Sequence, residues 1–202
     1  MAEVAKKFAN LTSLLSLLSV TTVYAALRYH VFADIPWSRF LLFVLNKALA
    51  WSALVLLALA SIKRVISTDT PTAATLFFQG IGLTMAHTLL SLLLLHPEEY
   101  PLFFNPENRF TVPIQLSFLV AIVGCTILLR SLGQRSLSLL FSFCMLLHTS
   151  LIGYSNWLHP EKWPGFMPPI TLLCSILSLI WTISLVYTIS RSFATQSTAP
   201  IP

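Results

Sequence analysis

Apolar residues dominate the chain in six long runs, which short polar segments separate. Each run has the roughly 20 residues that an α-helix needs to cross the hydrocarbon core of a bilayer. The pattern therefore predicts an all-α integral membrane protein, a bundle of six transmembrane helices. We expect the helices at Phe8–Leu27, Phe40–Ile62, Ala73–Leu95, Val112–Arg130, Ser136–Leu158 and Pro168–Ser190.

Composition supports a lipid bilayer as the surroundings of this chain. Charged residues make up 9% and apolar residues 56% of the sequence, whereas about a quarter of the residues in a soluble domain are charged. The net charge of +5 does not indicate nucleic-acid binding, because the basic residues are spread over the connecting segments. No length remains for a soluble domain, so we predict one transmembrane domain over residues 1–193 and a flexible tail over 194–202.

The first apolar run also resembles a signal peptide. Lys6 and Lys7 precede it, and Val23-Tyr24-Ala25 is similar to a cleavage site. We expect this run to be retained as a helix.

The charges of the loops predict an orientation. The N-terminus, the second and fourth loops and the C-terminus carry seven basic residues, and the other three loops carry four. The positive-inside rule then places both termini in the cytoplasm. The seven basic residues are Lys6, Lys7, Lys63, Arg64, Arg130, Arg135 and Arg191.

One pattern occurs twice in the chain, in Gly80–Pro101 and in Leu140–Pro164. Each copy has His-Thr inside an apolar run, at His87 and at His148, and ends in Leu-His-Pro-Glu. A histidine within a membrane span is costly and usually has a function. Two histidines at matched positions indicate a shared function.

The two buried histidines lie at similar depth. His87 is eight residues and His148 ten residues before the predicted outer end of its span. At 1.5 Å per residue, these depths are about 12 and 15 Å. If the third and fifth helices face one another, the two imidazoles could coordinate one metal from opposite sides.

The residues at this depth favour haem over zinc. Zinc usually takes about four ligands, but no carboxylate lies level with His87 and His148, and the three cysteines form no CxxC pair. Two axial imidazoles complete the coordination of a haem iron and suit electron transfer. The alternative is that the two histidines make only hydrogen bonds between helices.

Small residues accompany His87 along one helical face. Gly80, Thr84 and Ser91 recur with it at helical spacing. Such a stripe lets a planar macrocycle approach the helix closely, and it equally lets two helices pack closely.

Cations near the outer surface are candidate partners for haem propionates. Lys47, near the outer end of the second span, stands out, although a lysine there can also extend to the lipid headgroups. His96 and His159 lie at the membrane boundary, either as ordinary boundary residues or as a second outer site for a metal or a partner. The candidate cations are Arg28, Arg39, Lys47 and Arg109.

From about Arg28 to Arg191 the chain resembles the ferric reductase-like transmembrane domain family. The resemblance rests on the six spans, on LNKALAW at Leu45–Trp51, on His87 and His148, and on the Trp-Pro-Gly of the last outer loop. It implies b-type haem held by these two histidines, electron transfer, and a location that we expect to be a bacterial inner membrane.

The chain departs from the family pattern in one respect. Many members carry a second histidine on each of the two helices and hold two haems. Here the corresponding positions fall near Ala74 and near Gln134 and Arg135, none of which can ligate haem. The chain therefore resembles a member with one haem, in the outer half of the membrane.

We thus expect an electron-transfer subunit that works between a quinol or cytoplasmic donor and a partner protein on the outer side. The alternative from another class is a structural subunit of a larger respiratory or photosynthetic complex, with no redox role. A transporter fits less well, because transporters usually place ionisable groups near the midplane and no Asp or Glu lies within a predicted span.

Overall fold

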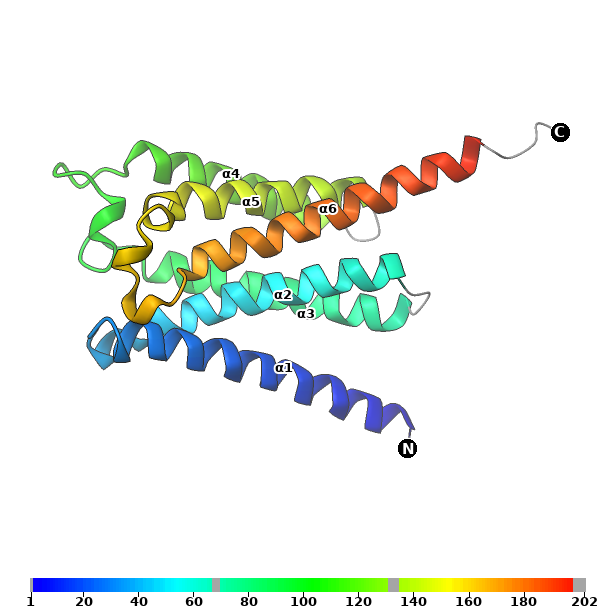
Figure 1. Cartoon of the computed structure of the whole chain (residues 1–202), viewed down its shortest axis with the longest axis horizontal. Coiled ribbons are helices and arrows are strands. Elements are labelled where there is room, and N and C mark those ends of the chain that lie inside the picture. Colours follow the sequence, from blue (N-terminus) through cyan, green and yellow to red (C-terminus); the bar gives the residue numbers. More distant parts are fainter. Residues whose placement is uncertain (1, 67–69, 131–134, 198–202) are drawn as a thin grey trace.

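The computed structural model describes residues 2–66, 70–130 and 135–197 of the chain. Six helices in these residues are long and apolar enough to cross a membrane, which confirms the predicted all-α bundle. The helices run side by side, and the start of the first helix lies at the same end of the bundle as the end of the last (Figure 1). They are α1 (Ala2–Ala26), α2 (Asn46–Ile66), α3 (Thr70–Leu93), α4 (Val112–Arg130), α5 (Arg135–Trp157) and α6 (Ile170–Ser197).

Two π-helical turns extend the first two spans beyond α1 and α2. Leu27–Val31 continues α1, and Leu41–Leu45 leads into α2. The first candidate span therefore runs to Val31, four residues past the predicted end, because hydrophobic periodicity does not reveal hydrogen bonds between residues five apart. At the other terminus α6 extends through Ser197, which makes the start of the predicted tail helical, and residues 198–202 lie outside the described residues.

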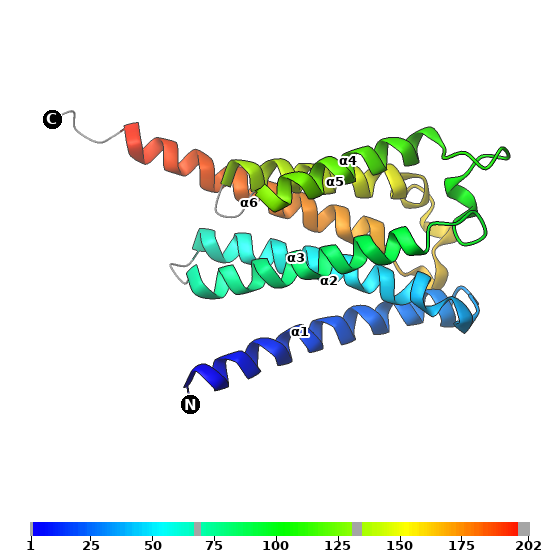
Figure 2. The same ribbon diagram turned by 180° about the vertical axis from the view of Figure 1, so that it is seen from behind.

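The bundle packs around α2, the most buried of the six spans. This helix contacts α1, α3 and α6, and α5 contacts α4 and α6, an arrangement that can be followed from both sides in Figures 1 and 2. Val44, Leu57, Phe141 and Trp181 are almost fully buried between these helices. In contrast, α3 makes few close approaches to α4 or α5 within the described residues.

Hydroxyl groups link neighbouring helices inside the bundle. Thr21 of α1 and Ser52 of α2 share a hydrogen bond of 2.8 Å, and Thr149 of α5 and Ser175 of α6 share one of 2.7 Å. In a bilayer such bonds add to van der Waals packing, because burial of apolar surface gives little drive for helices to associate.

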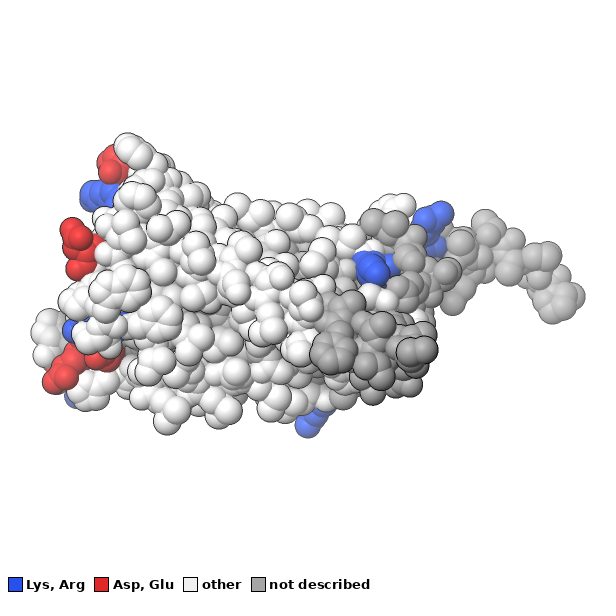
Figure 3. Space-filling model, turned by 90° about the horizontal axis from the view of Figure 1, so that it is seen from below, with Lys and Arg blue, Asp and Glu red and all other residues white. Residues whose placement is uncertain are grey.

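Charged side chains separate towards the two ends of the bundle. The Asp and Glu side chains that the structure describes all belong to the loops opposite the termini. The face in Figure 3 shows the carboxylates at one end, cations at both, and a broad uncharged band between them. That band is suited to contact with lipid. The side chains of Lys6, Lys7 and Arg135 are not among those that the structure describes.

The loops at the acidic end are tied to each other and to α1. The phenol of Tyr24 donates a 2.8 Å hydrogen bond to the carbonyl of Pro168, and the Arg28 side chain donates to the carbonyl of Met167. Four single turns of 3-10 helix shape this end, Trp37–Arg39, Pro101–Phe103, Pro160–Lys162 and Pro164–Phe166. The loops thus form an ordered cap.

The close approach of α3 to α2 at Gly80 gives a first test of this packing. A Cβ atom at Gly80 would lie 2.7 Å from Cγ of Leu57 and 3.2 Å from the carbonyl oxygen of Ala53. We expect Gly80→Val to lower the free energy of unfolding by about 1–3 kcal/mol through overpacking. Gly82→Val is the matched control, since no atom lies within 4 Å of its Cβ. Unfolding in one detergent measures both, and equal losses would contradict the packing.

Candidate functional site

His87 of α3 is held by a residue of α2. Its Nδ1 lies 2.7 Å from Oδ1 of Asn46 and 3.0 Å from the backbone carbonyl oxygen of the same residue. A carbonyl oxygen only accepts hydrogen bonds, so Nδ1 carries the proton and donates it. The neutral ring then has its free lone pair on Nε2.

The fold brings Asn46 to this position through a π-helical turn. Asn46 is the first residue of α2, and its backbone N–H bonds the carbonyl of Leu41, five residues earlier. Only 3% of Asn46 is exposed. Single π-helical turns are rare and frequently occur at functional sites, which makes Asn46 a candidate functional residue.

A small polar network extends from His87 towards the acidic end. The side-chain amide of Asn46 donates to the Ser91 hydroxyl at 3.0 Å and to the Tyr100 phenol at 3.3 Å. Ser91 in turn donates to Oδ1 of Asn46 at 3.2 Å. Burial raises the pKa of the Tyr100 phenol, so this phenol stays neutral at ordinary pH. The network connects the imidazole to the loop of Tyr100 at the acidic end.

His148 of α5 is held in the same way by Ser117 of α4. Its Nδ1 lies 2.8 Å from the Ser117 hydroxyl and 3.1 Å from the Ser117 carbonyl oxygen. The hydroxyl also donates to the carbonyl of His148, at 3.4 Å. The carbonyl acceptor again requires the proton on Nδ1. Each histidine is thus oriented by a backbone carbonyl and a side-chain oxygen of the preceding helix.

Both histidines leave Nε2 without a hydrogen-bond partner among the described residues. Both side chains are only partly buried. Histidines that bind metals almost always donate their other N–H to a carbonyl or carboxylate oxygen, which fixes the ring and its tautomer. This donor set therefore fits a haem iron held by His87 and His148.

The remaining side chains do not form a zinc-type cluster. Within the described residues, no three His, Cys, Asp or Glu side chains gather around a point where a metal ion could bind. A zinc site needs about four ligands, whereas an iron inside a porphyrin needs only two from the protein. The arrangement thus remains compatible with haem.

The predicted stripe of small residues faces α2 rather than an open space. Gly80 approaches Leu57 and Ala53, and the Thr84 hydroxyl donates to the carbonyl of Gly80 at 2.9 Å. Close packing of two helices, the alternative in the sequence analysis, accounts for Gly80. Ser91 belongs instead to the network around Asn46.

Two of the four candidate cations, Lys47 and Arg39, lie at the acidic end and have protein partners there. The ammonium of Lys47 lies 4.3 Å from the centre of the Tyr29 ring and 4.8 Å from that of Phe43. Nε of Arg39 lies 3.7 Å from a carboxylate oxygen of Glu99. A propionate contact for either residue stays a prediction.

The repeated Leu-His-Pro-Glu segments form similar exposed contacts on two loops. Nδ1 of His96 lies 4.0 Å from a Glu98 carboxylate oxygen, and Nδ1 of His159 lies 3.1 Å from that of Glu161. A hydrogen bond from its own backbone N–H, followed by one from His159, lowers the pKa of Glu161. These are local contacts within each loop, and a second outer site stays a prediction.

Asn46 and Ser117 were not predicted from the sequence as positioning residues. Asn46 could have been recognised in the sequence, since a buried asparagine in an apolar span needs a partner. Ser117 could not, because serine is common in membrane helices and its partner is 31 residues away.

No family model matches the chain, and no match is found among curated proteins. The resemblance to the ferric reductase-like family therefore stays a prediction that rests on the residues quoted for it.

The Asn46 network predicts a measurable loss of stability. In Asn46→Ala, His87 keeps only the backbone acceptor, and Ser91 and Tyr100 lose their partner. We expect the free energy of unfolding to fall by about 1–3 kcal/mol, as for other buried polar groups that lose a partner. Asn156→Ala is the control, because Asn156 is exposed and should change little. Chemical unfolding in detergent measures both, and equal stability of the two variants would refute the network.

Proposed function

We propose that the chain is a membrane-embedded b-type haem electron-transfer protein of the ferric reductase-like type, with His87 and His148 as the axial ligands. One observation carries the proposal. On two different helices, a histidine within the membrane donates its Nδ1 proton to a fixed oxygen of a neighbouring helix and keeps Nε2 free. Two such rings, one on α3 and one on α5, could hold a single metal between them.

The protein's own contribution is to orient the two rings. Asn46 and Ser117 fix the tautomer of each histidine, and their oxygens make each imidazole a stronger donor at Nε2. When bound, a haem with two imidazole ligands supplies a six-coordinate iron that exchanges single electrons. The few close approaches of α3 to α4 and α5 are consistent with a flat group between these helices.

The charge pattern supports an orientation for this subunit. We propose that both termini lie in the cytoplasm and that the membrane is a bacterial inner membrane. The ordered loops of the acidic end then form the docking face for an outer redox partner, with Arg39 and Lys47 as candidate propionate contacts. The electron donor in this proposal is a quinol or a cytoplasmic protein.

A structural subunit without a redox role is the second candidate. The hydrogen bonds of His87 to α2 and of His148 to α4 would also tie helices together. The free Nε2 atoms favour the first proposal, because a tie between helices needs only Nδ1.

Haem titration of the purified chain tests the proposal. We expect one b-type haem per chain, with a reduced low-spin spectrum that His87→Ala and His148→Ala each abolish. Asn46→Ala should keep the haem but lower its affinity about tenfold, since its oxygen orients a ligand. The controls are His96→Ala and His159→Ala, which alter exposed histidines and should bind haem normally.

Two results would contradict haem ligation by this pair. One is a chain that stays colourless after expression with added haem, which would favour the structural subunit. The other is a normal spectrum in both His87→Ala and His148→Ala.

A further inference from the structure

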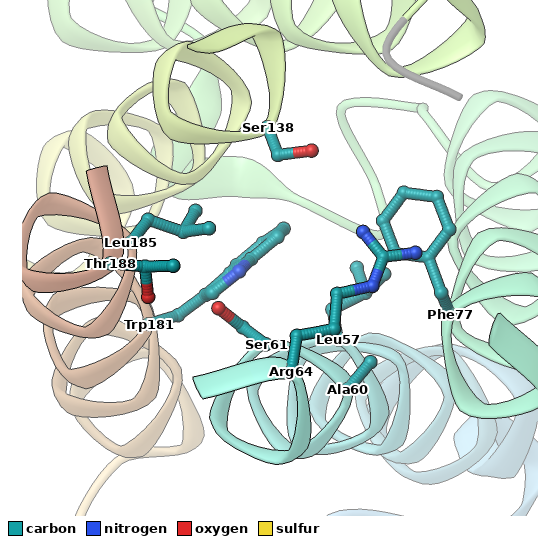
Figure 4. A pocket seen from close by; sticks show the side chains of 9 residues that line it. All are labelled: Leu57, Ala60, Ser61, Arg64, Phe77, Ser138, Trp181, Leu185 and Thr188. Atoms are coloured by element: carbon teal, nitrogen blue, oxygen red, sulfur yellow. The ribbon is translucent and has the colours of Figure 1, made fainter. Parts of the chain in front are cut away.

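A pocket lies in the half of the bundle away from His87 and His148. Phe77, in its wall, precedes His87 on α3 by ten residues, about 15 Å towards the end that carries the termini. The pocket is narrow and partly open. Figure 4 shows the side chains around it, which come from α2, α3, α5 and α6.

One buried donor faces this pocket without an acceptor. Ser61 of α2 is 5% exposed, and its hydroxyl has no hydrogen-bond partner among the described residues. Trp181 of α6, which is 1% exposed, also lines the pocket. A buried polar group without a partner is costly, so something with acceptor atoms is expected to occupy the pocket.

Arg64 adds a positive charge to the same pocket. Its guanidinium extends over the ring of Phe77, 5.2 Å from the ring centre (Figure 4). No Asp or Glu lines the pocket, and no described carboxylate lies within ion-pair distance of this guanidinium. Arginine presents several N–H donors in a planar fork that matches phosphate oxygens. A guanidinium, an indole N–H and a hydroxyl around one pocket select a ligand rich in acceptors and negatively charged.

The walls of the pocket indicate where this anion comes from. Leu57, Ala60 and Leu185 line the pocket alongside the polar groups. These apolar side chains make no favourable contact with a small hydrated anion. The pocket lies at the end of the bundle where no described Asp or Glu side chain is found. In the orientation proposed above, this end faces the cytoplasm, and basic pockets between membrane helices on that side are typical binding sites for anionic lipid headgroups.

We propose that this pocket binds the headgroup phosphate of an anionic phospholipid, through Arg64, Ser61 and Trp181. The phosphate oxygens accept from the guanidinium, the hydroxyl and the indole N–H, while the apolar walls contact the hydrocarbon next to the headgroup. This site is separate from the histidine pair and does not depend on haem.

Lipid titration of the purified full-length protein tests the site. The probes are phosphatidylglycerol, phosphatidylcholine and inorganic phosphate, and native mass spectrometry counts the molecules bound in one detergent. We expect one tightly bound phosphatidylglycerol. Arg64→Gln should weaken its binding about tenfold, the size expected for a lost hydrogen bond to a charged group, and Ser61→Ala and Trp181→Phe should each weaken it severalfold.

Lys63→Gln is the matched control, since it removes a positive charge one residue away on the same helix, and Lys63 does not line the pocket. We expect it to leave the affinity unchanged. If Arg64→Gln does not fold, the lipid affinities of Ser61→Ala and Trp181→Phe test the site instead, because both variants keep the positive charge of Arg64.

Three results would overturn the proposal. Equal weakening in Arg64→Gln and Lys63→Gln would mean non-specific attraction. Equal affinity for phosphatidylcholine would mean that the negative charge is not recognised. Displacement of the lipid by millimolar inorganic phosphate would assign the pocket to the free anion.

Discussion

The arrangement of this bundle towards its acidic end depends on one constraint, that a histidine inside a membrane needs a partner for its N–H. Hydrocarbon offers none, so the partner has to come from another helix. Asn46 and Ser117 provide it for His87 and His148, which fixes how α2 meets α3 and how α4 meets α5. The same hydrogen bonds leave the two Nε2 atoms available.

The two halves of the bundle are packed differently. In the half with the acidic loops, polar side chains orient two imidazoles and connect one of them to the loop of Tyr100. In the other half, aromatic residues fill the centre, with Phe141 and Trp181 packed edge to face at a centroid distance of 5.5 Å. That half also holds the Arg64 pocket. Each half thus places a few polar side chains at defined positions in an otherwise apolar bundle.

The sequence was enough to predict the six spans and to single out His87 and His148, because hydropathy over 20 residues and an imidazole inside an apolar run are local features. It was not enough to predict their partners, since Ser117 and Asn46 meet them only across helices. The neighbour of Gly80 could not be predicted either. A small residue permits close approach, but the sequence does not show whether a helix or a ligand approaches, and the structure places α2 there. The π-helical turn before Asn46 could not be predicted either, because the spacing of apolar residues does not reveal it.

The coordination of the iron is the central claim, and electron paramagnetic resonance of the oxidised, haem-loaded protein tests it most directly. If His87 and His148 both ligate the iron, no position on it would stay open, so the account predicts a low-spin ferric signal typical of two nitrogen ligands. A predominantly high-spin signal would mean an open coordination position and would contradict the paired-histidine site.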